Sequence, residues 1–205
     1  LIQGLLQGSI YGLIAVGLTL VYGLLRILHV AHAGLFTLGG YICVIVTNQT
    51  SSFLLAVLTS MILVGLAGMI IYRICYQPIL DQPPFVPLIA SIGLFIAMEE
   101  LFRIFFGAYG LSFTELPLQE PLALMQINLK QAEWITIASS VGFVAMLAFL
   151  ANRTKLGLAW KATVTDSEIA SSFGVNIIYV RYLNFFIGSS LACLLYTSPS
   201  PRDPM

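Results

Sequence analysis

Residues 153–181 read RTKLGLAWKATVTDSEIASSFGVNIIYVR and form a long polar interruption in an otherwise apolar chain. Thr165 is followed three residues later by Glu168, which predicts a capping box in which each side chain satisfies a backbone N–H of the first helical turn. Gly174 predicts the end of this helix, because glycine tolerates the left-handed conformation that terminates helices. The pattern therefore predicts a short helix held between two apolar segments.

One face of this predicted helix carries small side chains. Asp166, Ala170 and Gly174 recur at i, i+4 and i+8, so they are expected to share a face. A face with little side-chain bulk lets another backbone or a pocket wall come close. We interpret the stretch as a lever that another protein pushes, and the alternative is a capped helix that faces only solvent.

The composition places the chain in a membrane. Hydrophobic residues make up 59% of the sequence, charged residues only 9%, and the mean hydropathy is +0.95. A soluble domain carries roughly 25% charged residues. The formal net charge is zero, which gives no electrostatic footprint for binding nucleic acid. The three cysteines, Cys43, Cys75 and Cys193, lie in or beside apolar runs without metal-ligand spacing and are interpreted as small apolar residues.

The hydrophobic pattern predicts an all-α polytopic membrane protein with about six membrane spans, each long enough for roughly 30 Å of hydrocarbon. A proline-rich loop is expected between the third and fourth spans, and a compact external segment between the fourth and fifth. Glu99 and Arg103 lie at i and i+4 on the fourth span, which predicts an ion pair near the outer membrane face; the alternative is a part in a proton or substrate path. The expected spans are 1–25, 27–46, 53–72, 88–106, 134–152 and a segment beginning at Tyr182.

The basic residues predict the orientation of these spans. The 153–181 stretch holds four lysines and arginines, whereas the 107–133 loop holds only Lys130 beside three glutamates. The positive-inside rule therefore places the 153–181 stretch in the cytoplasm and the 107–133 loop outside.

His29 and His32 lie in the second predicted span, together with Gly34. One interpretation is a pair of buried histidines hydrogen-bonded between helices. Another is a place on a translocation path, because ionisable residues inside a membrane face cavities by default. A metal site would need further ligands, and the neighbouring sequence offers none.

Three segments resemble the permease subunits of branched-chain amino acid ABC importers. Residues 161–176, KATVTDSEIASSFGVN, resemble the cytoplasmic coupling loop of that family. Residues 12–23, GLIAVGLTLVYG, running on to the Ala-His pair at 31–32, are similar to its N-terminal signature. YQPI at 76–79 with PLIASIGL at 87–94 is similar to its middle signature. The three motifs occur in the family's order.

The resemblance assigns expectations to individual residues. It implies an ATPase-coupling role for the matching positions of the 161–176 segment. The family's usual Asn-Phe-Ala-His-Gly-Glu run is matched at 29–34 only at Ala31 and His32, and its acidic residue is absent. His29, His32 and Gly34 are the candidate translocation-path residues, because polar groups inside a membrane face cavities by default. The expected coupling residues are Ala162, Asp166, Ala170, Gly174 and Asn176.

The resemblance also implies partners and a location. It implies a multi-pass protein of the bacterial inner membrane that carries branched-chain or related amino acids. It implies two ABC ATPase subunits, a second homologous permease subunit, a periplasmic substrate-binding protein and membrane lipid as partners. ATP hydrolysis is expected on the ATPase subunits, so this chain is expected to be no enzyme and to need no cofactor or metal. The main rival interpretation is an ion-coupled secondary transporter of a small polar solute, and a third is an intramembrane metalloenzyme that uses His29 and His32.

The expected domain organisation is a single, incomplete transmembrane permease domain over 1–192, with the 153–181 coupling loop inside it. Residues 193–205 include LLYTSPSPRD, which resembles a translated sequencing-adapter sequence. We therefore expect this tail to be an artefact that follows a truncated permease sequence.

Overall fold

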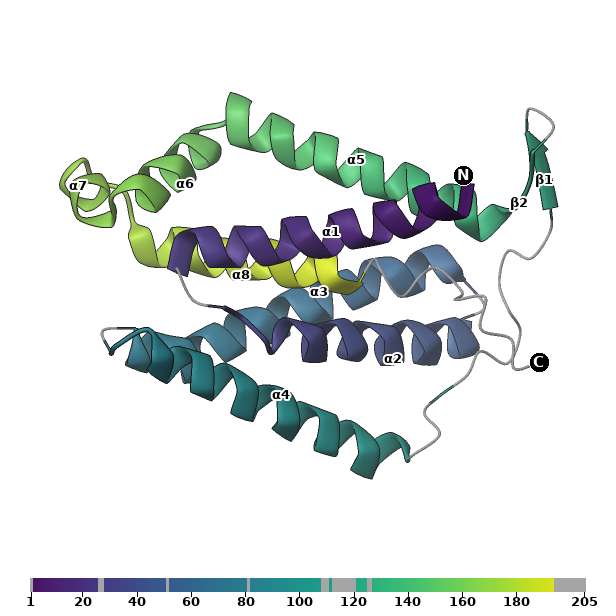
Figure 1. Cartoon of the computed structure of the whole chain (residues 1–205), viewed down its shortest axis with the longest axis horizontal. Coiled ribbons are helices and arrows are strands. Elements are labelled where there is room, and N and C mark those ends of the chain that lie inside the picture. The colour runs from purple at the N-terminus through teal and green to yellow at the C-terminus, as the bar shows by residue number, and fades with distance from the viewer. Residues whose placement is uncertain are drawn as a thin grey trace.

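The protein is described here by a computed structural model, which defines residues 2–25, 28–50, 52–80, 82–107, 111, 121–124 and 127–193. Long helices run back and forth along one axis (Figure 1). Residues 194–205, and with them nearly all of the tail expected to be an artefact, lie outside the described part. So do the loop glutamates Glu115 and Glu120.

The chain forms eight α-helices within the described residues, and the prediction of an all-α polytopic membrane protein is confirmed. One short antiparallel strand pair, β1 with β2, is the exception; it joins α4 to α5, pairs Leu122 with Leu129, and was not predicted. The elements are α1 (Ile2–Leu25), α2 (His32–Thr50), α3 (Phe53–Ile71), α4 (Phe85–Phe106), β1 (Pro121–Leu124), β2 (Ile127–Lys130), α5 (Gln131–Arg153), α6 (Lys155–Thr165), α7 (Ser167–Ser172) and α8 (Ile177–Cys193).

Some predicted span boundaries were wrong. The predicted 73–87 loop is largely helical, because α3 continues through a π-helical turn at Tyr72–Tyr76 and a 3-10 turn at Gln77–Ile79. The second span begins at His32 rather than at residue 27, after a non-helical connector.

Two helical segments in the described residues, Phe53–Ile79 and Phe85–Phe106, are long and apolar enough to cross a membrane. A third candidate is the bent pair Ser140–Arg153 and Lys155–Thr165, whose two halves meet at 81°. Two shorter apolar helical stretches, Tyr11–Leu25 and Ile177–Ala192, run through the same bundle. The expectation of about six spans stays a prediction.

The packing of the bundle depends on small residues between α3 and α8. A side chain at Gly68 would meet the hydroxyl of Ser189, and one at Gly65 would meet Ser190 and the ring of Phe186. The Ser190 hydroxyl donates to the Met61 carbonyl at 2.9 Å, so it is satisfied at this close approach. The helices can therefore come together only because both positions lack a Cβ.

A cluster of large side chains lies next to this contact. Tyr72, Tyr76 and Phe185 are buried together with Val21 and Leu25, so α1, α3 and α8 share one core. Helix α4 lies at the edge of the bundle and packs mainly on α2 (Figure 1). Much of its remaining surface is apolar and exposed, including Ile104 and Phe105, each 75% exposed.

Candidate coupling region and translocation pockets

Helices α6 and α7 form one end of the molecule, opposite the β1–β2 pair (Figure 1). The predicted polar interruption therefore contains two helices rather than one. Helix α6 begins because the Thr154 hydroxyl accepts a hydrogen bond from the Gly157 N–H at 3.1 Å. A Cβ on Gly157 would collide with the backbone of Leu150 and Ala151. This glycine therefore permits the 81° bend between α5 and α6.

The cap of α7 differs from the predicted capping box. The Asp166 carboxylate accepts hydrogen bonds from the N–H groups of Glu168 and Ile169, at 2.9 and 3.0 Å. Thr165 remains in α6, and its hydroxyl donates to the Lys161 carbonyl at 2.9 Å. Asp166 is the residue with extended backbone, at φ −154° and ψ 110°. The N-cap is therefore Asp166, one residue after the predicted position, and the capping-box prediction was wrong.

The predicted end of the helix is confirmed. Gly174 has φ 80°, its N–H donates to Ser171, and the next N–H, from Val175, donates to Ala170. This pair of hydrogen bonds is a Schellman motif, in which a left-handed residue closes the last helical turn.

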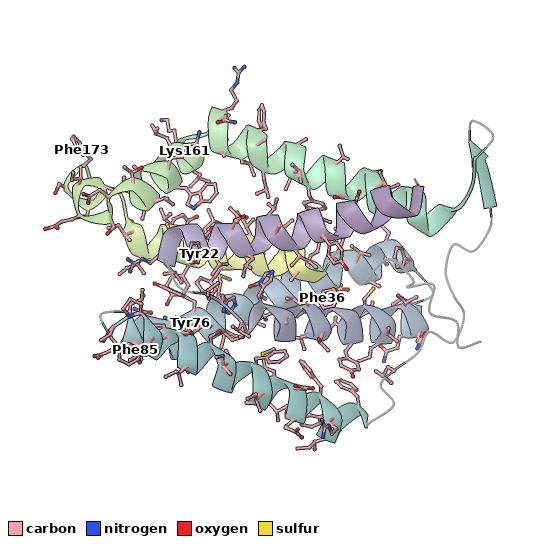
Figure 2. All side chains as sticks on the ribbon, in the orientation of Figure 1. Tyr22, Phe36, Tyr76, Phe85, Lys161 and Phe173 are labelled. Atoms are coloured by element: carbon pink, nitrogen blue, oxygen red, sulfur yellow. The ribbon has the colours of Figure 1, made fainter. Side chains whose placement is uncertain are left out.

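The predicted small-residue face does not form. Gly174 lies beyond the end of α7, and Ala170 is only 3% exposed because it packs within this chain. The exposed apolar side chains are instead Ile169, at 57%, and Phe173, at 85% (Figure 2). The sequence reasoning missed both residues; their apolar character in a polar stretch was the available signal.

The other two expected coupling residues serve the joints between helices. Asn176 lies before α8, and its side-chain oxygen accepts a hydrogen bond from the Tyr179 N–H at 3.1 Å. Ala162 is half-buried in α6, and its carbonyl accepts the N–H of Asp166 at 3.0 Å. Both residues therefore fix the direction in which α7 leaves its neighbours.

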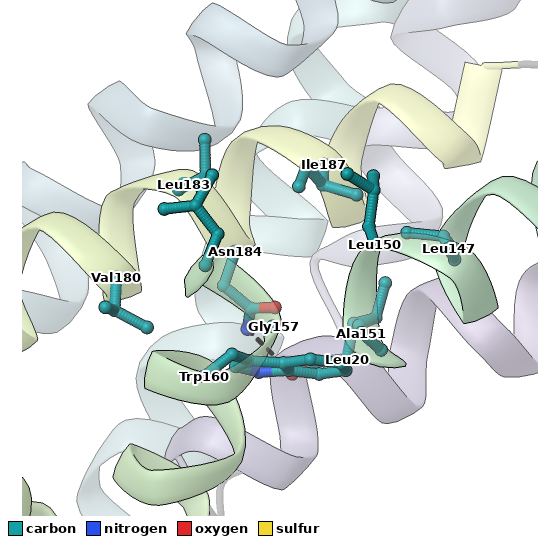
Figure 3. A pocket seen from close by; sticks show the side chains of 11 residues that line it. Leu20, Leu147, Leu150, Ala151, Gly157, Trp160, Val180, Leu183, Asn184 and Ile187 are labelled. Atoms are coloured by element: carbon teal, nitrogen blue, oxygen red, sulfur yellow. Dashed lines mark hydrogen bonds between the residues drawn. The ribbon is translucent and has the colours of Figure 1, made fainter. Parts of the chain in front are cut away.

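A cavity of about 70 Å³ lies inside the elbow between α5 and α6, against α1 and α8 (Figure 3). Asn184 reaches across it from α8 and donates to the Leu20 carbonyl at 2.7 Å. The indole N–H of Trp160 lines the same cavity and has no hydrogen-bond partner among the described residues. The elbow thus contacts the membrane helices through mostly apolar side chains, and neither Trp160 nor Asn184 was singled out from the sequence.

The two histidines are buried together. His29 lies in the non-helical connector before α2, and its Nδ1 is 2.6 Å from the Tyr76 hydroxyl. Its ring centroid is 5.9 Å from that of His32. The remaining nitrogen of His29 and both nitrogens of His32 have no hydrogen-bond partner within the described part of the chain. The two histidines are buried as predicted, but among the described residues only one of their four ring nitrogens, Nδ1 of His29, has the expected hydrogen-bond partner.

Two pockets flank α2, and they separate the three expected path residues. His29 and His32 line a pocket of about 270 Å³ between α1 and the start of α2. Gly34 lines a different pocket, of about 460 Å³, between α2 and α4. A Cβ on Gly34 would lie 2.9 Å from the Met98 sulfur, so this glycine also lets α4 approach.

The predicted ion pair on α4 was wrong in its acidic partner. Arg103 pairs with Glu100 at 3.5 Å, three residues away, and not with Glu99. Both spacings bring side chains together on a helix, so the sequence alone could not choose between the two glutamates.

Residues 1–195 match a family described as "Branched-chain amino acid transport system / permease component". The chain is 27% identical over 206 residues to the high-affinity branched-chain amino acid transport system permease protein LivH of Salmonella typhimurium, covering 94% of this chain and 67% of LivH. It is 28% identical over 207 residues to the corresponding protein BraD of Pseudomonas aeruginosa, covering 95% of this chain and 67% of BraD. No solved structure gives a significant match.

Proposed function

The chain belongs to the family of permease components of branched-chain amino acid transport systems, and we propose that it works as a membrane-spanning subunit of an ATP-driven importer in a bacterial inner membrane. The observation that carries this proposal is the family match over residues 1–195. The long apolar helices support a permease role, because they supply the spans that such a subunit needs. The proposed cargo is a branched-chain or related amino acid, as the names of the relatives indicate for those proteins.

The α6–α7 end is the proposed contact with the ATPase subunits. Arg153, Lys155 and Lys161 lie on α5 and α6 at this end, and Arg73 and Arg181 lie at the ends of α3 and α8 nearest to it. The positive-inside rule favours a cytoplasmic position for such an end. ATP hydrolysis then belongs to the partner subunits, and this chain transmits motion and is not itself an enzyme.

Within this end, the proposed coupling residues divide into two groups. Ile169 and Phe173 present apolar surface, which a cleft on the ATPase can bury. Asp166 and Gly174 fix the start and the end of α7 through the cap and the left-handed turn. The other expected coupling residues, Ala162, Ala170 and Asn176, hold α7 against α6 and α8. Movement of the ATPase would therefore act on a short, rigid unit.

The proposed translocation path follows α2. His29 and His32 line the pocket near the start of this helix, and Gly34 lines the next pocket along it. Unpartnered ring nitrogens can bind a polar solute, because a buried polar group without a partner costs free energy that a ligand can recover. A second permease subunit would close the open sides of these pockets, and a periplasmic binding protein would deliver the solute.

The test is reconstitution of the full-length importer in proteoliposomes with its ATPase subunits, its second permease and its binding protein. We expect uptake of labelled leucine that needs both ATP and the binding protein. Uptake driven by an ion gradient in the absence of ATP would contradict the importer and favour the secondary transporter.

A further inference from the structure

The pocket between α2 and α4 has the size and lining of a small-molecule site. Its volume of about 460 Å³ falls within the range of roughly 300–1,000 Å³ that is typical of ligand pockets. It lies between the first half of α2 and the second half of α4, since its lining runs from Gly34 to Tyr41 on α2 and from Phe95 to Gly107 at the end of α4. In Figure 1, α4 ends away from α7, at the end of the bundle where α1 begins.

Two opposite charges line this pocket. Glu99 and Arg103 both contribute, and they are one helical turn apart, about 6 Å along the axis. In the described part of the chain, the one salt bridge joins Arg103 to Glu100 and does not involve Glu99. The paired side chains are 59% and 54% exposed, so their pairing is weak and a ligand carboxylate can replace Glu100 at Arg103. The pocket therefore offers a carboxylate and a guanidinium at the same time.

Three aromatic side chains also line the pocket, together with Thr37 and two glycines. The aromatic residues are Phe95 and Phe102 on α4 and Tyr41 on α2. Tyr41 is held by its neighbours, because its ring stacks on Phe106 with centroids 4.2 Å apart and contacts Phe102 at 5.4 Å. These rings form an apolar wall next to the two charges.

We propose that this pocket receives a free α-amino acid with an apolar side chain. Glu99 accepts hydrogen bonds from the α-ammonium group, and Arg103 donates to the α-carboxylate, for which the planar guanidinium is well suited. The aromatic wall takes the side chain. This assignment rests on the proposed importer function and names the site at which the delivered amino acid is first held.

The test uses the reconstituted full-length importer with loaded binding protein, and it measures ATP hydrolysis and leucine uptake in the same sample. Glu99→Gln and Arg103→Gln are each expected to lower leucine uptake per ATP hydrolysed at least about tenfold, since hydrogen bonds to charged groups contribute on this scale. ATP hydrolysis stimulated by the binding protein should stay within about twofold, because Glu99 and Arg103 lie in the second half of α4, which ends away from α7. Ile104→Ala is the control: it changes a residue of the same helix that is 75% exposed and does not line the pocket, and it should leave the ratio unchanged.

The outcomes separate this site from the importer function itself. Failure of the unsubstituted complex to import leucine with ATP would contradict the proposed importer function and, with it, this site. Normal import by the unsubstituted complex, combined with an unchanged uptake-to-ATP ratio in both pocket variants, would overturn the site alone. Equal loss of hydrolysis and uptake, or the same loss in Ile104→Ala, would overturn it as well, because the effect would then not be specific to the pocket.

Discussion

At the residue scale, Gly174 decides how α7 ends. Its φ of 80° is favourable for glycine and costs about 1–2 kcal/mol for an ordinary L-residue. No atom outside its immediate neighbours lies within 4 Å of a Cβ built there, so the cost comes from the backbone rather than from a clash within the chain.

Substitution Gly174→Leu is expected to tilt or fray the end of α7 and to lower both stimulated ATP hydrolysis and uptake in the reconstituted importer. Gly174→Asn is the matched comparison, because asparagine tolerates the left-handed conformation better than other residues with a side chain. Asn should retain most of the activity. Equal activity in the Leu and Asn variants would show that the left-handed turn plays no part in transmission.

Asp166 provides a second residue-scale prediction. Asp166→Ala removes the acceptor of two backbone N–H groups and should cost about 1 kcal/mol of helix stability. We expect faster amide hydrogen exchange at Glu168 and Ile169, measured by mass spectrometry on the complex. Thr165→Ala should leave that exchange unchanged, because the Thr165 hydroxyl bonds within α6. Faster exchange in the Thr165 variant alone would restore the capping box predicted from the sequence.

These two residues also show what the sequence could predict locally. The glycine stop was predictable, since few residues other than glycine adopt the required φ. The cap was predictable only to within one position, because Thr165 and Asp166 are both good capping residues and the choice depends on where α6 stops. The partner of Arg103 was undetermined for a similar reason, as Glu99 and Glu100 both lie within reach.

At the element scale, the 81° elbow between α5 and α6 is the feature that brings α7 to the end of the bundle. It requires Gly157, because α6 passes directly over the carbonyl of Leu150. Thr154 stabilises the same turn from both sides: its hydroxyl accepts from Gly157 and donates to the Leu150 carbonyl at 2.6 Å.

Gly157→Ala is therefore expected to lower the stability of the elbow by roughly 1–3 kcal/mol, the usual cost of forcing an extra group into packed structure. The expected readout is a lower midpoint of thermal unfolding for the purified full-length protein. Gly142→Ala is the control. Gly142 lies in α5, and a Cβ built there has no other side chain or helix within 4 Å. A midpoint lowered equally by both substitutions would contradict the close contact at the bend.

The elements were predictable where their hydrophobicity was continuous. The helices from 53 to 71 and from 85 to 106 agree with two predicted spans to within a few residues. Helix α6 was missed because its apolar residues Leu156, Leu158 and Trp160 are two positions apart rather than at helical spacing, and because they lie within a segment that contains four basic residues. The strand pair was missed because each strand has only four residues: INLK at 127–130 alternates apolar and polar residues, but PLAL at 121–124 does not.

At the scale of the whole molecule, contacts between distant parts of the chain were beyond sequence reasoning. The His29–Tyr76 hydrogen bond joins residues 47 positions apart, and Asn184 reaches a carbonyl 164 positions away. Gly34 is separated from the two histidines because the start of α2 lines one pocket with residues of α1, whereas Gly34 lies on the side of α2 that meets α4. A pattern on one helix can show that residues share a face, but it cannot show which neighbour covers that face.

The α6–α7 end of this permease subunit is proposed to contact an ATPase subunit. The direct measurement is photo-crosslinking in the assembled full-length importer, with a photoreactive phenylalanine analogue placed at Phe173 or, as the matched control, at Phe105. Both native residues are phenylalanines and largely exposed, at 85% and 75%. Phe173 directly follows α7, and Phe105 lies in the last turn of α4, which ends at the opposite end of the bundle (Figure 1). We expect position 173 to crosslink to the ATPase subunit and position 105 to crosslink to lipid or the second permease. Crosslinking of the ATPase from position 105 and not from position 173 would contradict the proposed contact.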